Sequence, residues 1–556
     1  MSWTMNRREV LALGAASIAS TALAGQEKGP VTSSIIQEHD KRLKSMLSGQ
    51  VTDLNSTWRG AIPDHVGLHT PQSVARFLRD AAAAYFHPQS AYHADKGVYE
   101  RMALGVGFME RSQSDDGNID LLSTNFNSPP DTGFVVHSVG TAARLAQMHD
   151  DGAMVSLLKP FLRKAGFGLA KGGVHTPNHR WVICAALAQI NGVYPDARFI
   201  KRIDEWLAEG IDIDEEGQYT ERSTAGYNAV VNHALVVTAH KLDRPALLDP
   251  VRKNLDAMAY LLHPNGEVVT AISRRQDLNT RGTMANYWFP LRYMAIRDGN
   301  GLYASMLKPH EPGRIELAFM MEYPELGQEL PKPAPIPQDY VKHYPAYGIT
   351  RIRRGRTSAT IMHDGRSRWI AMHRGEAVIN AVRFACSFFG KGQFVPREFE
   401  CRDDGYHFRQ ELEACYYQPI TDPSLLPIGA ELRSKRDRSE ECRMVYEGHI
   451  RETSNGFEIA ISAYGTDGVP LAVEVNLRDG GELNGVSPLP SPGDAYVLKE
   501  GFAEYRSGSD IIRFGPGHAE HAYVQVRGAE GKLPGPSVYL TGFTPFKRTL
   551  QFMLSS

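Results

Sequence analysis

The sequence has few residues that form covalent or metal cross-links. Its five cysteines are an odd number, and no two of them show C-x-x-C spacing. A zinc–thiolate site and a disulfide framework are therefore poorly supported, although one disulfide in the later half stays open in an oxidising compartment. We expect Cys184, within an apolar run, to be a small buried hydrophobe. No ligand spacing indicates a metal, and the sequence predicts no cofactor.

An excess of charge of either sign is also absent. The chain carries 61 basic and 63 acidic residues, a net charge of −2. Nothing in this balance attracts a nucleic acid, so a bound anion must meet a local group of positive charges. With 42% hydrophobic residues among 556, the composition is globular, and the length favours two domains.

No run of about 18 apolar residues, the length that spans a bilayer, follows the first 25 residues. Residues 1–24 have twin arginines, Arg7 and Arg8, then a short apolar region and Ala22-Leu23-Ala24. This pattern predicts a twin-arginine export signal that is cut before Gly25. We therefore expect a periplasmic or secreted protein, with no membrane partner after cleavage.

Residues 25–325 have a helical period interrupted by Gly, Pro and Asp. Amphipathic segments such as "RFIKRIDEWLAEG" alternate with segments such as "HRWVICAALAQI" that are apolar nearly all round. Paired outer and inner helices are typical of an (α/α) toroid, an incomplete barrel of helical hairpins. The toroid would be the catalytic domain, with inner helices lining a central depression.

The texture changes after residue 325. Residues 326–345 are rich in proline and predict a semi-rigid linker. Residues 346–556 contain short alternating runs bounded by Gly, Asp and Pro, which predict an antiparallel β-sandwich. The expected architecture is thus an α+β multidomain chain, with a cleft between toroid and sandwich.

One stretch, "GGVHTPNHRWVICAALAQING", places polar residues at the start of an apolar helix. Thr176 as N-cap and Pro177 as first residue would put Asn178 and His179 in the first turn. Free backbone N–H groups and the helix dipole favour an anion there. The alternative is that both side chains only cement the helix end.

A second such helix follows one hairpin later. "STAGYNAVVNHALVV" places Tyr227 near its start, 48 residues after His179, so both would lie at the same rim. Asn228 and Asn232 share a face, and His233 adjoins them. Such polar groups either line a cavity or form a buried hydrogen-bonded network.

The Asn178-His179 step and Tyr227 resemble the heparinase II/III-like polysaccharide lyases, which include the oligoalginate lyases. The resemblance covers the mature chain in architecture and these few residues in motif; "FFGKGQF" (388–394) adds a weaker likeness. It implies β-elimination on a uronic-acid-containing polysaccharide or oligosaccharide. Asn178 and His179 would neutralise the uronate carboxylate, and Tyr227 would act as base, acid or both.

The resemblance also implies a His or Tyr from the sandwich. His363 is our first choice, His373 the second and His407 the third. As further substrate-binding residues we expect Arg180, Arg222, Asn232, His233, Arg275 and His373. Arginine forks such as that of Arg275, in the loop "SRRQDLNTRG", suit carboxylates.

Two other readings stay open. A glycoside hydrolase on the same toroid would use paired carboxylates among Asp131, Glu221 and Asp277. A non-catalytic carbohydrate-binding protein would show aromatic platforms without a titratable pair, and Tyr227 near a histidine argues mildly against it.

Overall fold

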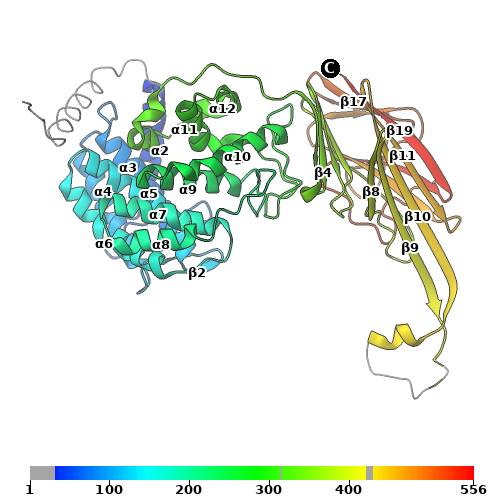
Figure 1. Cartoon of the computed structure of the whole chain (residues 1–556), viewed down its shortest axis with the longest axis horizontal. Helices are drawn as coiled ribbons and strands as arrows, with labels where there is room; N and C mark the ends of the chain where they lie inside the picture. The colour runs from blue at the N-terminus through cyan, green and yellow to red at the C-terminus, as the bar shows by residue number, and fades with distance from the viewer. Residues whose placement is uncertain (1–31, 314–315, 421, 423–429, 556) are drawn as a thin grey trace, which may run out of the picture. The chain divides into compact units, whose positions relative to one another are not determined.

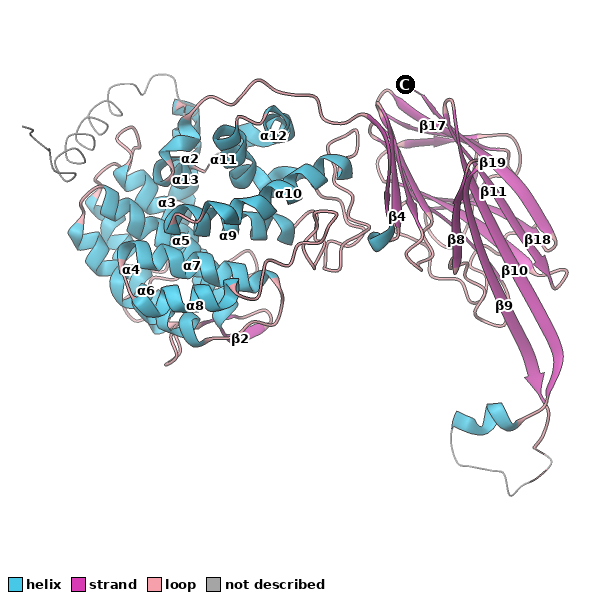
Figure 2. Ribbon diagram, viewed as in Figure 1, coloured by secondary structure: helices cyan, strands magenta, loops and turns pink. Residues whose placement is uncertain are grey.

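The computed structural model describes residues 32–313, 316–420, 422 and 430–555, so the predicted export signal lies outside them. The chain divides into two compact units, Met1–Ala259 with Ser273–Ile336, and Tyr260–Ile272 with Pro337–Ser556. No helix among the described residues is long and apolar enough to cross a membrane. The first unit is helical and the second is made of β-strands (Figures 1 and 2).

Helical hairpins build the first unit. Its α-helices are α2 (Ser33–Gly49), α3 (Pro71–Phe86), α4 (Lys96–Arg111), α5 (Pro129–Met148), α6 (Gly152–Lys171), α7 (Asn178–Val193), α8 (Ala197–Leu207), α9 (Tyr227–Leu242), α10 (Asp249–Met258), α11 (Trp288–Asp298), α12 (Gly301–Leu307) and α13 (Leu317–Glu322). A two-stranded sheet, β1 (Ile119–Leu121) with β2 (Asn125–Ser128), precedes α5.

Two layers of helices form the toroid, as the sequence predicts. The inner helices α3, α5, α7 and α9 pack side by side in that order, and α11 contacts α9 (Figure 1). The outer helices α4, α6 and α8 each pack against the inner helix that precedes them. Burial follows the sequence: α7 is buried almost throughout its first 13 residues, whereas only Phe199 and Ile203 of α8 are buried.

The start of α7 differs from the expected cap. The helix begins at Asn178, and Pro177 is the preceding residue, with helical φ and ψ. Thr176 is not an N-cap, because its hydroxyl accepts a hydrogen bond from Asn178 Nδ2 (3.2 Å) and not from a backbone N–H. The side chain of Asn178 competes for that hydroxyl, and Asn178 is thereby turned inward at the helix mouth.

Two antiparallel sheets form the second unit. One has the order β13-β16-β17-β19-β11-β10-β9-β8, and the other β14-β15-β18-β12-β7-β6-β5-β4-β3, with β15 and β18 parallel. The strands are β3 (Asp339–Tyr344), β4 (Ile349–Arg354), β5 (Thr357–Met362), β6 (Ile370–Arg374), β7 (Ala377–Cys386), β8 (Glu398–Arg402), β9 (Gly405–Tyr417), β10 (Arg438–Thr453), β11 (Gly456–Gly465), β12 (Pro470–Leu477), β13 (Glu482–Asn484), β14 (Ser487–Pro488), β15 (Ala495–Val497), β16 (Ala503–Ser507), β17 (Asp510–Gly515), β18 (Ser537–Phe543) and β19 (Phe546–Ser555).

Side chains from both sheets share one core. Trp369 is fully buried and contacts Phe384 of β7, Phe394, and Phe408 of β9 edge to face. Alternation along each strand supplies this apolar layer, as expected for a sandwich. All five cysteines are free thiols, so no disulfide joins the later half of the chain.

A segment from the middle of the helical sequence belongs to the second unit. Residues 260–272 form a bridged turn whose backbone is held by arginines of β4: Leu262 O accepts from Arg351 (3.3 Å) and Arg353 (3.2 Å). Strand β3 also lies within the proline-rich residues 326–345. Neither feature has a helical or strand period that the sequence pattern displays.

Gly448 tests how tightly the sandwich core is packed. A Cβ at this position would lie 2.5 Å from the Trp369 ring. We expect Gly448→Ala to lower the free energy of unfolding by about 1–3 kcal/mol, because an overpacked core must shift its neighbours. Urea denaturation measures the change. Gly493→Ala is the matched control, since a Cβ there meets nothing within 4 Å; equal stability of the two variants would contradict the packing.

Candidate active site

Three inner helices begin close together in the fold because α5, α7 and α9 pack side by side in the same direction. Their first residues are Pro129, Asn178 and Tyr227. Helix N-termini carry unpaired N–H groups and partial positive charge, which favours anionic groups. The rim formed by these three ends is the candidate site.

Glu221 occupies the centre of the candidate site. Its side chain is 6% exposed, and its Oε2 accepts a hydrogen bond from Asn178 Nδ2 (2.6 Å). Its Oε1 forms an ion pair with Arg275 Nη1 (2.9 Å). Burial raises the pKa of Glu221, while the hydrogen bond from Asn178 and the charge of Arg275 act in the opposite direction. The carboxylate thus joins the start of α7 to the loop that carries Arg275.

Arg275 links this carboxylate to Tyr227. Its guanidinium carbon lies 4.6 Å from the centre of the Tyr227 ring, a cation–π arrangement. The half-buried Tyr227 is the first residue of α9, and its backbone N–H donates to Ser223 Oγ (2.9 Å). Asn178, Glu221, Arg275 and Tyr227 therefore form one connected group from three separate segments.

His179 lies beside this group as a neutral side chain. It is 7% exposed, and its ring meets His175 edge to face, with ring centres 4.7 Å apart. Burial lowers the pKa of His179 to about 4, helped by His175 and Arg275 and opposed by Asp131. Among the described residues, neither His179 Nδ1 nor Asn178 Oδ1 has a hydrogen-bond partner. Unsatisfied buried polar atoms are uncommon, and here they leave capacity for a ligand.

The loop with Arg275 is braced by Asp277. Its carboxylate accepts hydrogen bonds from Ser223 Oγ (2.9 Å), from the Ala225 backbone N–H (3.1 Å) and from Ser273 Oγ. Ser273 Oγ in turn accepts from the Arg275 N–H (3.1 Å). This brace sets the backbone before α9 and the arginine loop in register.

Other predicted residues of the first unit lie apart from this group. Arg180 forms ion pairs with Glu209 (2.8 Å) and Asp212 (3.0 Å) and covers the Trp181 ring. Asn232 accepts from Tyr219 OH (2.7 Å) and donates to Asn254 (2.8 Å). These contacts favour structural roles for both residues.

His233 and Arg222 complete the predicted set in the toroid. His233 packs against Phe289, Phe319 and His137, and burial lowers its pKa to about 3, which favours a structural role. Arg222 follows Glu221 in the turn before α9, with a left-handed φ of 49°. Its neighbour Glu221 pairs with Arg275, so the two adjacent charges serve different partners.

The predicted histidines of the sandwich have different surroundings. His363 follows β5 and stacks on Phe399, with ring centres 3.8 Å apart; burial lowers its pKa. His373 on β6 is 5% exposed and stacks on His263 (3.5 Å), which favours a structural role. His407 on β9 stacks on His449 (4.2 Å) and contacts Asp404.

The carboxylates of the hydrolase reading are all engaged by donors. Asp131 accepts from Ser128 Oγ (2.6 Å) and Asn125 Nδ2 (2.8 Å) at the start of α5, and Asp277 is the brace described above. Glu221 is shared by Asn178 and Arg275. No contact in the described part of the chain sets two of these carboxylates across an open space.

Comparison with solved structures places this build, a helical toroid followed by an antiparallel sandwich, among the polysaccharide lyases. The xanthan lyase of Paenibacillus superimposes with a TM-score of 0.57 at 9% identity, over 93% of this chain. This chain spans 56% of the length of that lyase. The chondroitin AC lyase of Streptomyces coelicolor A3, solved with chondroitin sulphate, gives 0.54 at 12% identity, over 96% of this chain and 81% of the lyase. No family model and no curated protein matches the sequence.

Glu221 is expected to stabilise the site as well as organise it. At pH 8, Glu221→Gln should lower the free energy of unfolding by about 2 kcal/mol, because Arg275 loses a largely buried charged partner. Glu209→Gln, which alters an ion pair whose carboxylate is 49% exposed, should cost less than about 1 kcal/mol. Urea denaturation compares the two variants, and an equal or smaller effect at Glu221 would contradict its central place.

Proposed function

We propose that this protein is a polysaccharide lyase that cleaves a uronic-acid-containing polysaccharide or oligosaccharide by β-elimination. The observation that carries the proposal is the connected group of Asn178, Glu221, Arg275 and Tyr227 at the mouth of three inner helices. The fold of the xanthan and chondroitin AC lyases supports the same reaction class. We assign the chain to the heparinase II/III-like group because the Asn178-His179 step is followed one hairpin later by Tyr227.

The reaction needs positive charge and hydrogen bonds at one carboxylate. The C5–H proton of a uronate is only weakly acidic while the adjacent carboxylate is charged, and donors around that carboxylate stabilise the enolate as it forms. A base removes the C5 proton, the C4–O bond breaks, and an acid gives a proton to the leaving oxygen. The product has a C4–C5 double bond, and water is not consumed.

The residues of the candidate site suit these tasks. The side chains that hold Glu221 are the kind that hold a uronate carboxylate. Arg275 uses Nη1 for Glu221 and Nε for Gln276 (3.4 Å), and a guanidinium has five N–H donors, so donors remain for substrate. His179 is neutral near pH 7 and can donate or accept a hydrogen bond. Tyr227, beside the positive charge of Arg275, is the proposed base and acid.

The sandwich is proposed to supply a further acid–base group, for which His363 is preferred. Its depressed pKa leaves the imidazole neutral and able to accept a proton near pH 7. We further propose that the protein is exported through the twin-arginine signal in residues 1–24. An acidic polysaccharide outside the cytoplasm is then the substrate, with no cofactor taking part.

Tyr227→Phe tests the proposed base. The variant should lose about 100-fold or more of the rate at which a 4,5-unsaturated product absorbs in the ultraviolet, because a positioned acid–base group contributes at least that factor. The substrates are alginate, glucuronan, hyaluronan, chondroitin sulphate, heparin and xanthan. Tyr92→Phe, on a half-buried tyrosine outside the site, should keep full activity. Full activity of Tyr227→Phe, or new reducing ends without absorbance, would contradict the lyase mechanism; the latter result indicates a hydrolase.

The pH dependence of kcat/KM tests the state of His179. Its folded pKa, lowered to about 4, means that the free enzyme keeps this imidazole neutral as pH falls through 6.5. We expect the part of the acid limb that His179→Gln removes to lie near pH 4, where the imidazole gains its proton. An acid limb near pH 6.5 that disappears in His179→Gln would show that His179 titrates like an exposed histidine.

A further inference from the structure

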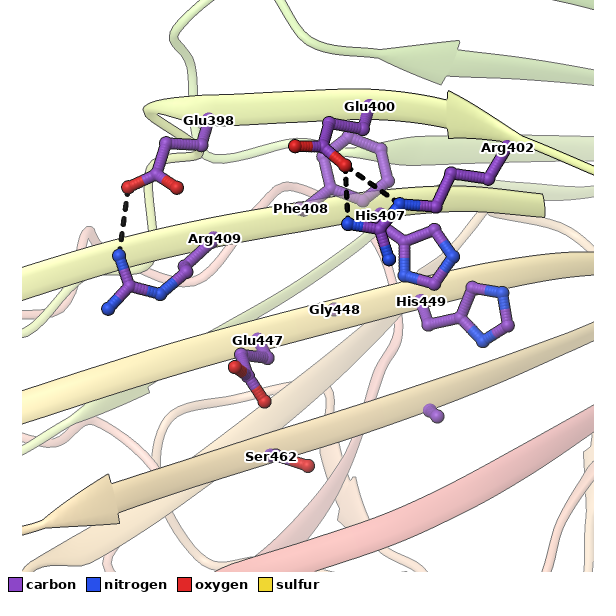
Figure 3. A pocket seen from close by; sticks show the side chains of 11 residues that line it. Glu398, Glu400, Arg402, His407, Phe408, Arg409, Glu447, Gly448, His449 and Ser462 are labelled. Atoms are coloured by element: carbon purple, nitrogen blue, oxygen red, sulfur yellow. Dashed lines mark hydrogen bonds and ion pairs between the residues drawn. The ribbon is translucent and has the colours of Figure 1, made fainter. Parts of the chain in front are cut away.

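A row of polar side chains crosses one face of the eight-stranded sheet. Glu400 on β8 lies opposite His407 on β9, and His407 lies opposite His449 on β10. Because side chains alternate between the faces of a sheet, these three directly paired residues share one face. They line a groove with a volume of about 270 Å³, which Figure 3 shows.

Asp404 brings a carboxylate to the two histidines. It lies in the two-residue turn between β8 and β9, and its Oδ1 is 2.8 Å from His407 Nε2. His449 Nε2 lies 3.1 Å from the Asp404 carbonyl oxygen and 3.8 Å from Asp404 Oδ2. Ligand atoms of all three residues fall within 4.8 Å of one another. Both imidazoles therefore direct the same nitrogen, Nε2, toward one residue.

The turn can approach β10 closely because Gly405 has no side chain. Its φ is +133°, and a Cβ there would lie 2.3 Å from the Ile450 carbonyl oxygen and 3.0 Å from His449 Nε2. The backbone is thus built to hold Asp404 beside His449. The two histidine rings stack with centres 4.2 Å apart and an angle of 13°, so their nitrogens are aligned.

The neighbouring charges leave these three residues free for another ligand. Glu400 is occupied by Arg402 Nε (2.7 Å), and Glu398 by Arg409 Nη1 (2.9 Å), as the dashed lines in Figure 3 show. Asp404 is exposed, and the side chains of His407 and His449 are 25% and 29% exposed. An ion can therefore reach them from solvent.

We propose that Asp404, His407 and His449 form a binding site for a divalent transition metal, with Zn²⁺ as the preferred ion. Two imidazole nitrogens and one carboxylate oxygen suit Zn²⁺, whereas Mg²⁺ and Ca²⁺ require oxygen ligands. Each imidazole would bind the ion through Nε2 and carry its proton on Nδ1. Three protein ligands leave a fourth tetrahedral position for water.

The bound ion would fasten the β8–β9 turn to β10. Asp404 and His407 come from adjacent positions of the turn and β9, whereas His449 is 42 residues beyond His407, so the ion closes a long loop of chain. A ligand that binds only the folded state raises its stability in proportion to the logarithm of its concentration. The site lies within the sandwich unit, and its existence does not depend on the proposed lyase activity.

Metal binding by the full chain, purified without a histidine tag and stripped with EDTA, tests the site. Calorimetric titration with Zn²⁺ should show one tight site per chain, and Zn²⁺ should raise the melting temperature. Co²⁺ should give the visible d–d absorption of a tetrahedral nitrogen–oxygen site. His449→Ala and Asp404→Asn should each weaken Zn²⁺ binding about 100-fold, more than the 10- to 100-fold typical when only a supporting partner of a ligand is lost.

His518→Ala provides the matched control. His518 pairs with Glu520 (2.7 Å) in the same unit, and the described residues place no second metal-binding group with this pair. Circular dichroism and metal-free melting curves confirm that each variant is folded. The proposal is overturned if the parent chain binds no Zn²⁺, if His449→Ala binds it as tightly as the parent, or if His518→Ala weakens it equally. Tighter binding of Mg²⁺ than of Zn²⁺ would also overturn it.

Discussion

The buried carboxylate of Glu221 is the interaction on which the first unit's site depends. A carboxylate removed from water is costly unless donors and positive charge surround it. Asn178 from the start of α7 and Arg275 from a loop 54 residues later meet this requirement together. Tyr227 is then positioned through Arg275, so one electrostatic demand aligns three segments that hydrophobic packing alone would leave unspecified.

The toroid provides the stage for this interaction through ordinary packing. Inner helices such as α7 are apolar on all sides, which leaves only their ends for polar chemistry. Helices that alternate in direction put every second N-terminus on the same rim. A polar residue at the first position of an inner helix therefore faces its neighbours' first residues, however far apart they are in the chain.

Helical and strand periods were enough to predict the toroid and the sandwich, because burial repeats regularly along both kinds of element. Asn178, His179, Tyr227 and Arg275 could be singled out because polar groups at apolar helix ends need partners. The role of Glu221 could not be foreseen, since its partners lie 43 residues before it and 54 after it. The Asp404–His407–His449 cluster has the same difficulty: a turn and two strands supply it, with no recognisable ligand spacing.

The segment 260–272 makes the boundary between the two units less simple than a linker. It is anchored in the sandwich by Arg351 and Arg353, yet the chain re-enters the toroid at Ser273, two residues before Arg275. Removal of the sandwich would therefore free one end of the loop that holds the arginine beside Tyr227. The helical unit is consequently not a self-contained module, and catalytic competence would be inherited by the two units jointly.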